Sequence, residues 1–166
     1  ADIEDSELPM NFETEFGTLI IGTRGDDRYE KVPFIIDPGG DDKYINCGGA
    51  IGLIGNSGGI SFIIDLAGDD FYSSEEIVSV ASGLFGAALI FDFEGDDVYR
   101  SSHYSIGSGY LGFGYLKDFQ GDDVYKGGIF SLGAGNFGIG ILLDREGNDF
   151  YYTCLLYTSD AADEED

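Results

Sequence analysis

The sequence is organised by one eight-residue pattern that returns at a nearly constant interval. Its clearest copy is 118–125 (DFQGDDVY), and its general form is Asp-x-x-Gly-Asp/Asn-Asp-x-Tyr. A partial copy without the first Asp spans 25–29. Full copies follow at spacings of 28, 27, 26 and 26 residues, and they begin at Asp37, Asp65, Asp92, Asp118 and Asp144. A period of this length predicts a solenoid, in which each unit is one coil that buries its apolar face by stacking on its neighbours.

The stretches between the acidic motifs are rich in glycine and indicate β-strands. In 106–116 (IGSGYLGFGYL) and 132–142 (LGAGNFGIGIL), Gly alternates with Phe, Tyr, Ile or Leu. This alternation has no helical period, and so many glycines would destabilise a helix. A coil of this length holds two or three short strands, each parallel to its predecessor at about 4.8 Å. We therefore expect an all-β parallel β-solenoid, a right-handed β-helix with coils of 26–28 residues.

Stacking of the coils places equivalent residues above one another and so predicts ladders. One is aromatic, formed by Tyr44, Tyr72, Tyr99, Tyr125 and Tyr151. Another is aliphatic and fills the interior, formed by Ile35, Ile63, Ile90, Leu116 and Leu142.

Three further columns are acidic. We call them the leading position (Asp37, Asp65, Asp92, Asp118, Asp144), the middle position (Asp41, Asp69, Asp96, Asp122, Asn148) and the final position (Asp42, Asp70, Asp97, Asp123, Asp149). Two carboxylates about 5 Å apart repel by roughly 3 kcal/mol at an effective dielectric near 20. Either these side chains splay into water or cations lie between them. Because all the ligands are oxygens, Ca²⁺ is the expected ion, and we predict that all three columns are metal ligands.

The charge of the chain limits its partners. It has 166 residues, with 8 basic and 32 acidic side chains and a formal net charge of −24. This balance excludes a nucleic-acid surface and favours divalent cations as partners. No apolar run is long enough for a membrane span. The hydrophobic content of 43% is sufficient for a packed core.

We divide the chain into three segments. Residues 1–16 are expected to be irregular or to cap the solenoid, and residues 17–153 are expected to be the repeats of a truncated fragment. Residues 154–163 (CLLYTSDAAD) resemble a translated transposase-type sequencing adapter, so 154–166 is interpreted as an artefactual tail. Outside that tail Cys47 is the one cysteine, which excludes a disulfide framework.

The Gly-Asp-Asp-x-Tyr elements and residues 147–151 (GNDFY) resemble the Gly-Asn-Asp-x-hydrophobic element of the repeats-in-toxin family. That family forms secreted parallel β-rolls that bind Ca²⁺ in Gly-Asp turns, with a motif every nine residues. Here the motif recurs every 26 to 28 residues, leaving one acidic turn per coil. The whole chain is more similar to uncharacterised bacterial proteins with long Gly-Asp-Asp-x-Tyr repeats. This resemblance implies a solenoid and assigns no activity. The resemblances and the acidic charge together lead us to expect an extracellular or cell-surface location.

Several alternatives remain at this stage. Gly, Asp and Asn form turns, so the motif could serve only to bend the coil. Paired-carboxylate catalysis is disfavoured because the acids recur in every coil, and the Gly-x-Gly-x-x-Gly matches at 107–112 and 133–138 lie inside the repeat without a following helix. His103 aligns with Ile129, which argues against a catalytic base. Arg100 and Lys126 are expected to offset acidic charge.

We therefore expect a non-enzymatic extracellular or surface structural protein, stabilised by Ca²⁺. It would bind divalent cations and, through exposed aromatic residues, glycans or other surface proteins. The alternatives are a carbohydrate-binding or lyase-like β-helix and a passive spacer without ligand.

Overall fold

The computed structural model describes residues 8–52 and 59–153 of the chain. Within these ranges every regular element is a β-strand, and none is a helix that could cross a membrane. The segment 154–166, interpreted above as an adapter-derived tail, lies outside the described residues. The strands form three sheets, here called A, B and C.

The strands of each sheet come from successive coils. Sheet A contains, in spatial order, β1 (Met10–Thr14), β2 (Gly17–Ile21), β4 (Phe34–Asp37), β7 (Ile60–Asp65), β10 (Ala87–Asp92), β13 (Phe113–Asp118) and β16 (Ile139–Leu143). Sheet B contains β17 (Phe150–Thr153), β14 (Val124–Gly127), β11 (Val98–Ser101), β8 (Phe71–Ser74), β5 (Lys43–Ile45) and β3 (Arg28–Glu30). Sheet C contains β15 (Gly135–Asn136), β12 (Gly109–Tyr110), β9 (Ser82–Leu84) and β6 (Gly49–Ile51).

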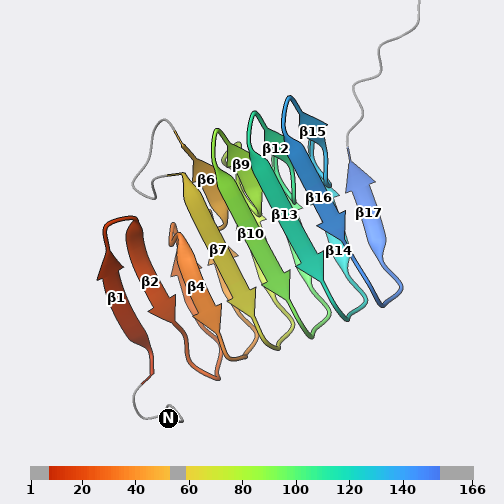
Figure 1. The fold of residues 1–166 in the computed structure, drawn as a ribbon. Coiled ribbons are helices and arrows are strands. Elements are labelled where there is room, and N and C mark those ends of the chain that lie inside the picture. The colour runs from red at the N-terminus through yellow and green to blue at the C-terminus, as the bar shows by residue number, and fades with distance from the viewer. Residues whose placement is uncertain (1–7, 53–58, 154–166) are drawn as a thin grey trace, which may run out of the picture.

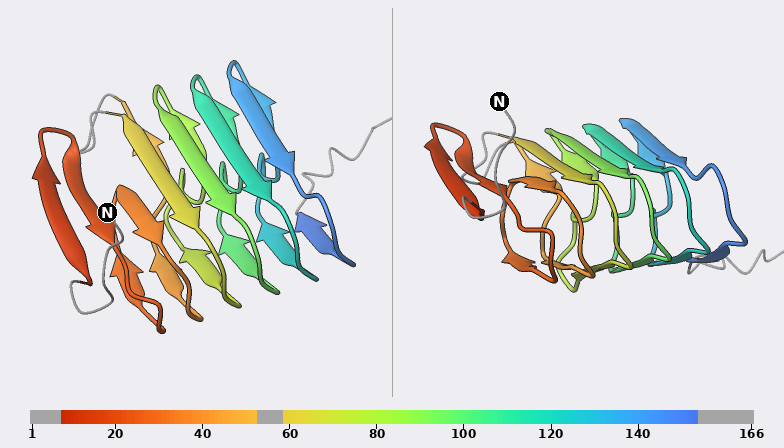
Figure 2. Two further views of the ribbon diagram at one scale, coloured as in Figure 1. Left: turned by 60° about the horizontal axis from the view of Figure 1, so that its bottom comes forward. Right: turned by 90° about the horizontal axis from the view of Figure 1, so that it is seen from below.

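The predicted parallel β-solenoid is confirmed. From β2 onward, all pairings within the three sheets are parallel. In Figure 1 the chain runs down sheet A, returns on the far side and advances along one axis, so the coil is right-handed. Figure 2 shows sheets A and B as opposite walls of the coil, joined along one side by the turns that carry the acidic motif.

Register places equivalent residues of successive coils directly above one another, and this confirms the predicted core ladders. Ile35 pairs with Ile63, Ile63 with Ile90 and Ile90 with Leu116, and all four side chains are fully buried. The tyrosine rings of sheet B are stacked, with centroids 4.5–4.9 Å apart from Tyr44 to Tyr151. Tyr29 of the partial motif extends this stack by one ring.

The N-terminal segment, expected to be irregular or to cap the solenoid, contains the strand β1 at residues 10–14. This strand pairs antiparallel with β2 and covers the first edge of sheet A. Gly17 begins β2 directly after the turn, and its φ of 124° is unfavourable for other residues. Adjacent to it, the first coil is short: equivalent residues Asp27 and Asp42 are 15 residues apart, and no strand of sheet C comes from that coil.

The glycine of each acidic motif is required by the close approach of successive coils. At Gly95 the φ angle is 148°, and an added Cβ would lie 1.8 Å from the carbonyl oxygen of Gly68. Gly121 makes the same contact with Gly95, also at 1.8 Å. Only glycine allows this backbone approach, so the motif stacks without a gap at the turn where the acids lie.

Candidate cation site

Two of the three acidic positions in each coil point into the solenoid. The leading aspartates Asp37, Asp65, Asp92 and Asp118 end the strands of sheet A, two residues after the core aliphatic ladder. Because side chains alternate along a strand, they face the same side as that ladder. Each of these four carboxylates is 0% exposed. The final aspartates Asp42, Asp70, Asp97 and Asp123 lie two residues before the buried tyrosines and are 0–2% exposed.

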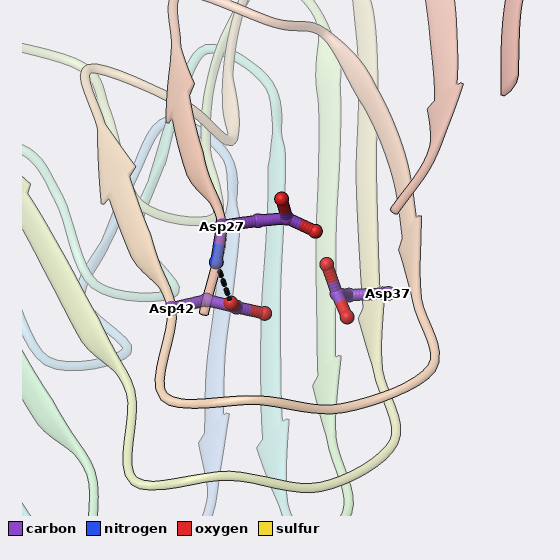
Figure 3. A group of neighbouring side chains, drawn as sticks. All are labelled: Asp27, Asp37 and Asp42. Atoms are coloured by element: carbon purple, nitrogen blue, oxygen red, sulfur yellow. Dashed lines mark hydrogen bonds between the residues drawn. The ribbon is translucent and has the colours of Figure 1, made fainter. Parts of the chain in front are cut away.

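These inward-pointing carboxylates meet in five clusters, in which the candidate ligand atoms all lie within 4.8 Å of one another. Each cluster joins the final aspartate of one coil to the leading and final aspartates of the next. Figure 3 shows the first cluster, with three carboxylates directed toward a common centre. The clusters are Asp27/Asp37/Asp42, Asp42/Asp65/Asp70, Asp70/Asp92/Asp97, Asp97/Asp118/Asp123 and Asp123/Asp144/Asp149. Adjacent clusters share a final aspartate, so they form one continuous row.

Each final aspartate is held by the backbone of the preceding coil. The Asp97 Oδ1 atom accepts a hydrogen bond from the Asp70 N–H at 2.7 Å, and the Asp123 Oδ1 atom accepts one from the Asp97 N–H at 2.8 Å. The same bond joins Asp27 N–H to Asp42 Oδ1, as drawn in Figure 3. One oxygen of each carboxylate is therefore fixed by the fold, which leaves Oδ2 to face the cluster.

Four of the five leading aspartates are oriented by a buried tyrosine hydroxyl, and the fifth, Asp144, by the half-exposed Tyr151. Tyr72 donates to Asp92 Oδ2 at 2.6 Å, and Tyr99 donates to Asp118 Oδ2 at 2.7 Å. Tyr44 donates to Asp65 in the same way. The tyrosine ladder thus packs the core with its rings and orients the acids with its hydroxyls.

Several buried carboxylate oxygens have no hydrogen-bond partner. They are Asp42 Oδ2, Asp70 Oδ2, Asp97 Oδ2, Asp92 Oδ1, Asp118 Oδ1 and Asp144 Oδ1. Asp70, Asp92 and Asp97 belong to one cluster, so every member of it has an unpartnered oxygen. A buried polar atom without a partner costs about 1–3 kcal/mol, and more when it is charged. These oxygens therefore require a cation or a proton.

The environment of the clusters favours the neutral carboxyl when no cation is bound. Burial is the largest cause and raises the pKa of Asp65, Asp92 and Asp97. The charges of neighbouring aspartates raise these pKa values further. The pKa of Asp97 rises to about 7 and that of Asp123 to about 7. At neutral pH the row can therefore hold protons that are shared between the leading and final aspartates of one coil, or it can exchange these protons for cations.

The middle position, predicted above as a third column of ligands, lies apart from the clusters. Asp41, Asp69, Asp96, Asp122 and Asn148 are exposed, and none of them belongs to a cluster found among the described residues. They carry a ladder of their own: Asp96 Oδ1 accepts from the Asp122 N–H at 2.8 Å, and Asp122 Oδ1 accepts from the Asn148 N–H at 2.8 Å. This geometry supports a structural role for the middle position and leaves it outside the candidate site.

One residue of the row was missed in the sequence. Asp27 belongs to the partial motif and occupies the final position in the first cluster. Its alignment with Asp42 in Gly-Asp-Asp-x-Tyr was the available signal. The leading position of that coil is occupied by Gly22, where an added Cβ would lie 1.9 Å from the Tyr29 hydroxyl and 2.2 Å from Asp37 Oδ2. The end of the row thus lacks one acid for steric reasons.

The other residues considered as functional candidates in the sequence lie away from the row of acidic clusters. His103 Nδ1 accepts a hydrogen bond from the Ile129 N–H at 2.9 Å, which gives this side chain a structural role. Arg100 and Lys126 occupy equivalent positions on the neighbouring strands β11 and β14, on the outer face of sheet B. Cys47 is buried, and burial raises the pKa of its thiol to about 11. A thiol with this pKa is a poor metal ligand.

Comparisons with protein-family models, with curated proteins and with solved structures find no match to this chain. The structure itself supports two statements: the chain is a β-solenoid of stacked repeats, and its stacked buried aspartates could hold metal ions.

Proposed function

We propose that the chain is a non-enzymatic structural solenoid whose coils are held together by a row of Ca²⁺ ions bound along the acidic turns. The observation that carries this proposal is that Asp70, Asp92 and Asp97 meet in one cluster and that each has a buried oxygen without a hydrogen-bond partner. Three buried carboxyl groups with ligand oxygens within 4.8 Å of one another form a site for positive charge that the fold has already desolvated.

The surroundings of the row favour an external cation as the counter-charge. The groups whose charges raise the pKa values of these carboxyls are other aspartates, such as Asp97 and Asp65 acting on Asp92. The hydrogen bonds to the clusters come from tyrosine hydroxyls and backbone N–H groups. These donors carry no formal charge, so they orient the carboxylates without neutralising them.

The ligand chemistry favours Ca²⁺ among the common metals. The clusters offer only carboxylate oxygens, which suit hard cations rather than Zn²⁺. Mg²⁺ demands near-octahedral geometry and usually keeps several waters, whereas these aspartates are 0–2% exposed in the three central clusters. Ca²⁺ accepts irregular oxygen sets and carboxylates that bridge two ions. The shared final aspartates would act as such bridges.

Sharing of ligands gives the row a structural consequence. When a cation fixes Asp97 in one cluster, it also places a ligand of the next cluster. Binding should therefore be cooperative along the axis and should stabilise the stacking of coils, which is the interaction on which any solenoid depends. Because the same arrangement recurs in every coil, it supports a scaffold rather than a single catalytic centre.

An extracellular or cell-surface location would fit a fold that depends on bound Ca²⁺, because Ca²⁺ is plentiful there. The resemblance of the acidic turns to repeats-in-toxin elements supports the same location. Folding would then be coupled to export, because the buried carboxyl groups stay protonated or repel one another until they bind Ca²⁺.

The test is the number of Ca²⁺ ions bound per chain, measured by equilibrium dialysis and atomic emission. Asp97 belongs to two clusters and Asp92 to one. We expect Asp97→Asn to lose about twice as many bound ions as Asp92→Asn, and the exposed control Asp96→Asn to lose none. A wild-type chain that binds no Ca²⁺, or equal losses in all three variants, would contradict the proposal.

A further inference from the structure

The outer face of sheet A is apolar along the whole solenoid. Two outward columns run from β2 to β16, with one residue from each strand. They are Leu19, Phe34, Phe62, Leu89, Tyr115 and Ile141, and beside them Ile21, Ile36, Ile64, Phe91, Lys117 and Leu143. A shorter column adds Ile60, Ala87, Phe113 and Ile139. None of these residues is acidic, although the chain has a net charge of −24.

The outer face of sheet B shows that a strand of this solenoid can carry charged and polar residues on its outer side. Its outward columns mix charged, polar and apolar residues, and they are Arg28, Lys43, Phe71, Val98, Val124 and Phe150, with Glu30, Ile45, Ser73, Arg100, Lys126 and Tyr152. Figure 2 shows that the described chain leaves the outer face of sheet A uncovered. Contiguous apolar patches of this kind mark interaction surfaces.

We propose that the outer face of sheet A packs against the same face of a second copy of this chain. Six strands, β2 to β16, lie side by side in this face. At about 4.8 Å per strand and about 17 Å of strand length, each copy contributes roughly 500 Å². Two copies together bury about 1,000 Å², which is near the lower limit of a specific interface. The expected complex is a reversible dimer formed by two sheets packed about 10 Å apart.

The two ends of the face differ in a way that suits a second copy. At the N-terminal end an apolar groove of about 280 Å³ is lined by Thr14, Phe16, Leu19, Phe34, Ile60 and Phe62. At the other end Ile139 and Leu143 lie on the last strand of sheet A and are 59% and 47% exposed. A two-fold axis that lies between the two faces, perpendicular to the solenoid axes, makes the solenoids antiparallel and places the exposed end of each copy over the groove of its partner. Such an isologous contact is self-complementary and closes at the dimer.

Charge also favours a second copy over a lipid surface. The face has a single cation among its outward columns, Lys117, whose Nζ lies 3.7 Å from the centre of the Phe119 ring. Binding to an anionic bilayer requires a basic cluster, and the strongly acidic chain would be repelled. Between two copies the repulsion is long-range and screened by salt. The dimer should therefore become stronger as salt is raised, the opposite of an interface held by ion pairs.

Sedimentation velocity of the full chain over a concentration series, at low and high salt, tests this proposal. We expect a concentration-dependent dimer that Leu89→Lys on β10 converts to a monomer. The matched control is Val98→Lys on β11, a half-buried outward position at the centre of sheet B, and it should leave the dimer unchanged. Ile139→Ala should raise the dimer dissociation constant by about tenfold or more through the lost apolar burial. Circular dichroism melts verify that each variant is folded.

Three results would overturn the proposal. The first is a wild-type chain that is monomeric at every concentration and salt level. The second is a dimer that survives folded Leu89→Lys, which would assign association to the open strand edges at the ends of the solenoid. The third is a monomer that co-floats with phosphatidylcholine vesicles, which would assign the face to lipid.

Discussion

Asp96 and Asp97 are neighbours in the sequence and have opposite surroundings. Asp96 is exposed, and its carboxylate accepts the N–H of Asp122 in the following coil. Asp97 is fully buried, and its carboxylate accepts the N–H of Asp70 in the preceding coil. Together the two carboxylates link their coil to the coils on both sides, but only Asp97 has a buried oxygen without a hydrogen-bond partner. A stacked carboxylate that water solvates therefore needs nothing more than its hydrogen bond to the next coil. A stacked carboxylate from which water is excluded also needs a proton or a cation.

The largest expected effect is that the pH dependence of stability changes sign when Ca²⁺ replaces EDTA. The folded-state pKa values of Asp97 and Asp123 are about 7, above the unfolded value of about 3.9. In EDTA their stabilisation is fully present below about pH 4 and is lost as the pH rises through 7, at about 1.4 kcal/mol per pH unit for each group. With Ca²⁺ the carboxylates must be deprotonated, so stability should rise over the same range.

Thermal melts between pH 4 and 8, in EDTA and in Ca²⁺, measure these two slopes. High-salt melts serve as the control, because salt screens the exposed acids but not the buried row. Parallel slopes in EDTA and Ca²⁺ would show that the buried carboxyls do not exchange protons for the metal.

The next largest effect separates the two neighbours directly. In Ca²⁺, Asp97→Asn should lower the free energy of unfolding by about 3–5 kcal/mol, since it removes one partner of a buried charged group. Asp96→Asn should lower it by about 1 kcal/mol or less, because the amide oxygen can still accept the Asp122 N–H.

In EDTA at pH 8 the order should reverse, with Asp97→Asn as stable as the wild type or more stable, because a buried charge has been removed. Urea unfolding of both variants in the two conditions checks this. An Asp97→Asn variant that is equally destabilised with and without Ca²⁺ would contradict a metal role for Asp97.

A smaller effect is expected for Tyr99→Phe. The hydroxyl of Tyr99 donates to Asp118 Oδ2 at 2.7 Å, while its ring stacks on Tyr72 and Tyr125 at 4.7 and 4.8 Å. Phenylalanine keeps the stack and loses the bond, which should cost about 1.5–3 kcal/mol. Tyr151→Phe is the matched control, because its hydroxyl bonds Asp144 at the half-exposed end of the row. Equal urea midpoints for Tyr99→Phe and the wild type would show that the hydroxyl ladder does not orient the acids.

Much of the fold was predictable because a fixed period determines which residues stack. The core ladders followed from Tyr99 and Ile90 and their equivalents at 26 to 28 residues. The separation into buried and exposed acidic columns was also predictable. Asp97 lies two residues before Tyr99 and Asp96 lies three residues before it, so the alternation of side chains along a strand predicts that the two acids face opposite sides. The sequence alone predicts ligands in all three acidic columns, whereas the structure places only two of the columns in the clusters.

Other features have no signal in local sequence. The corners between sheets use apolar residues in the left-handed conformation, such as the buried Ile106 at a φ of 53° and the half-buried Leu132 at 55°. Tertiary packing holds these angles against a cost of roughly 1–2 kcal/mol each. The β1 strand likewise depends on the free edge of β2, since Met10–Thr14 is short and mostly exposed.

A thermal melt of the full chain tests whether the buried row of aspartates binds Ca²⁺. The melt is recorded in EDTA and across a Ca²⁺ titration at neutral pH, with Mg²⁺ as the control. A ligand that binds only the folded state stabilises it by RT ln(1 + [L]/Kd) for each site. We expect the melting temperature to rise steeply with Ca²⁺ and little with Mg²⁺. A melting temperature that Ca²⁺ leaves unchanged would contradict Ca²⁺ binding by the row and would leave the buried aspartates as proton-sharing pairs.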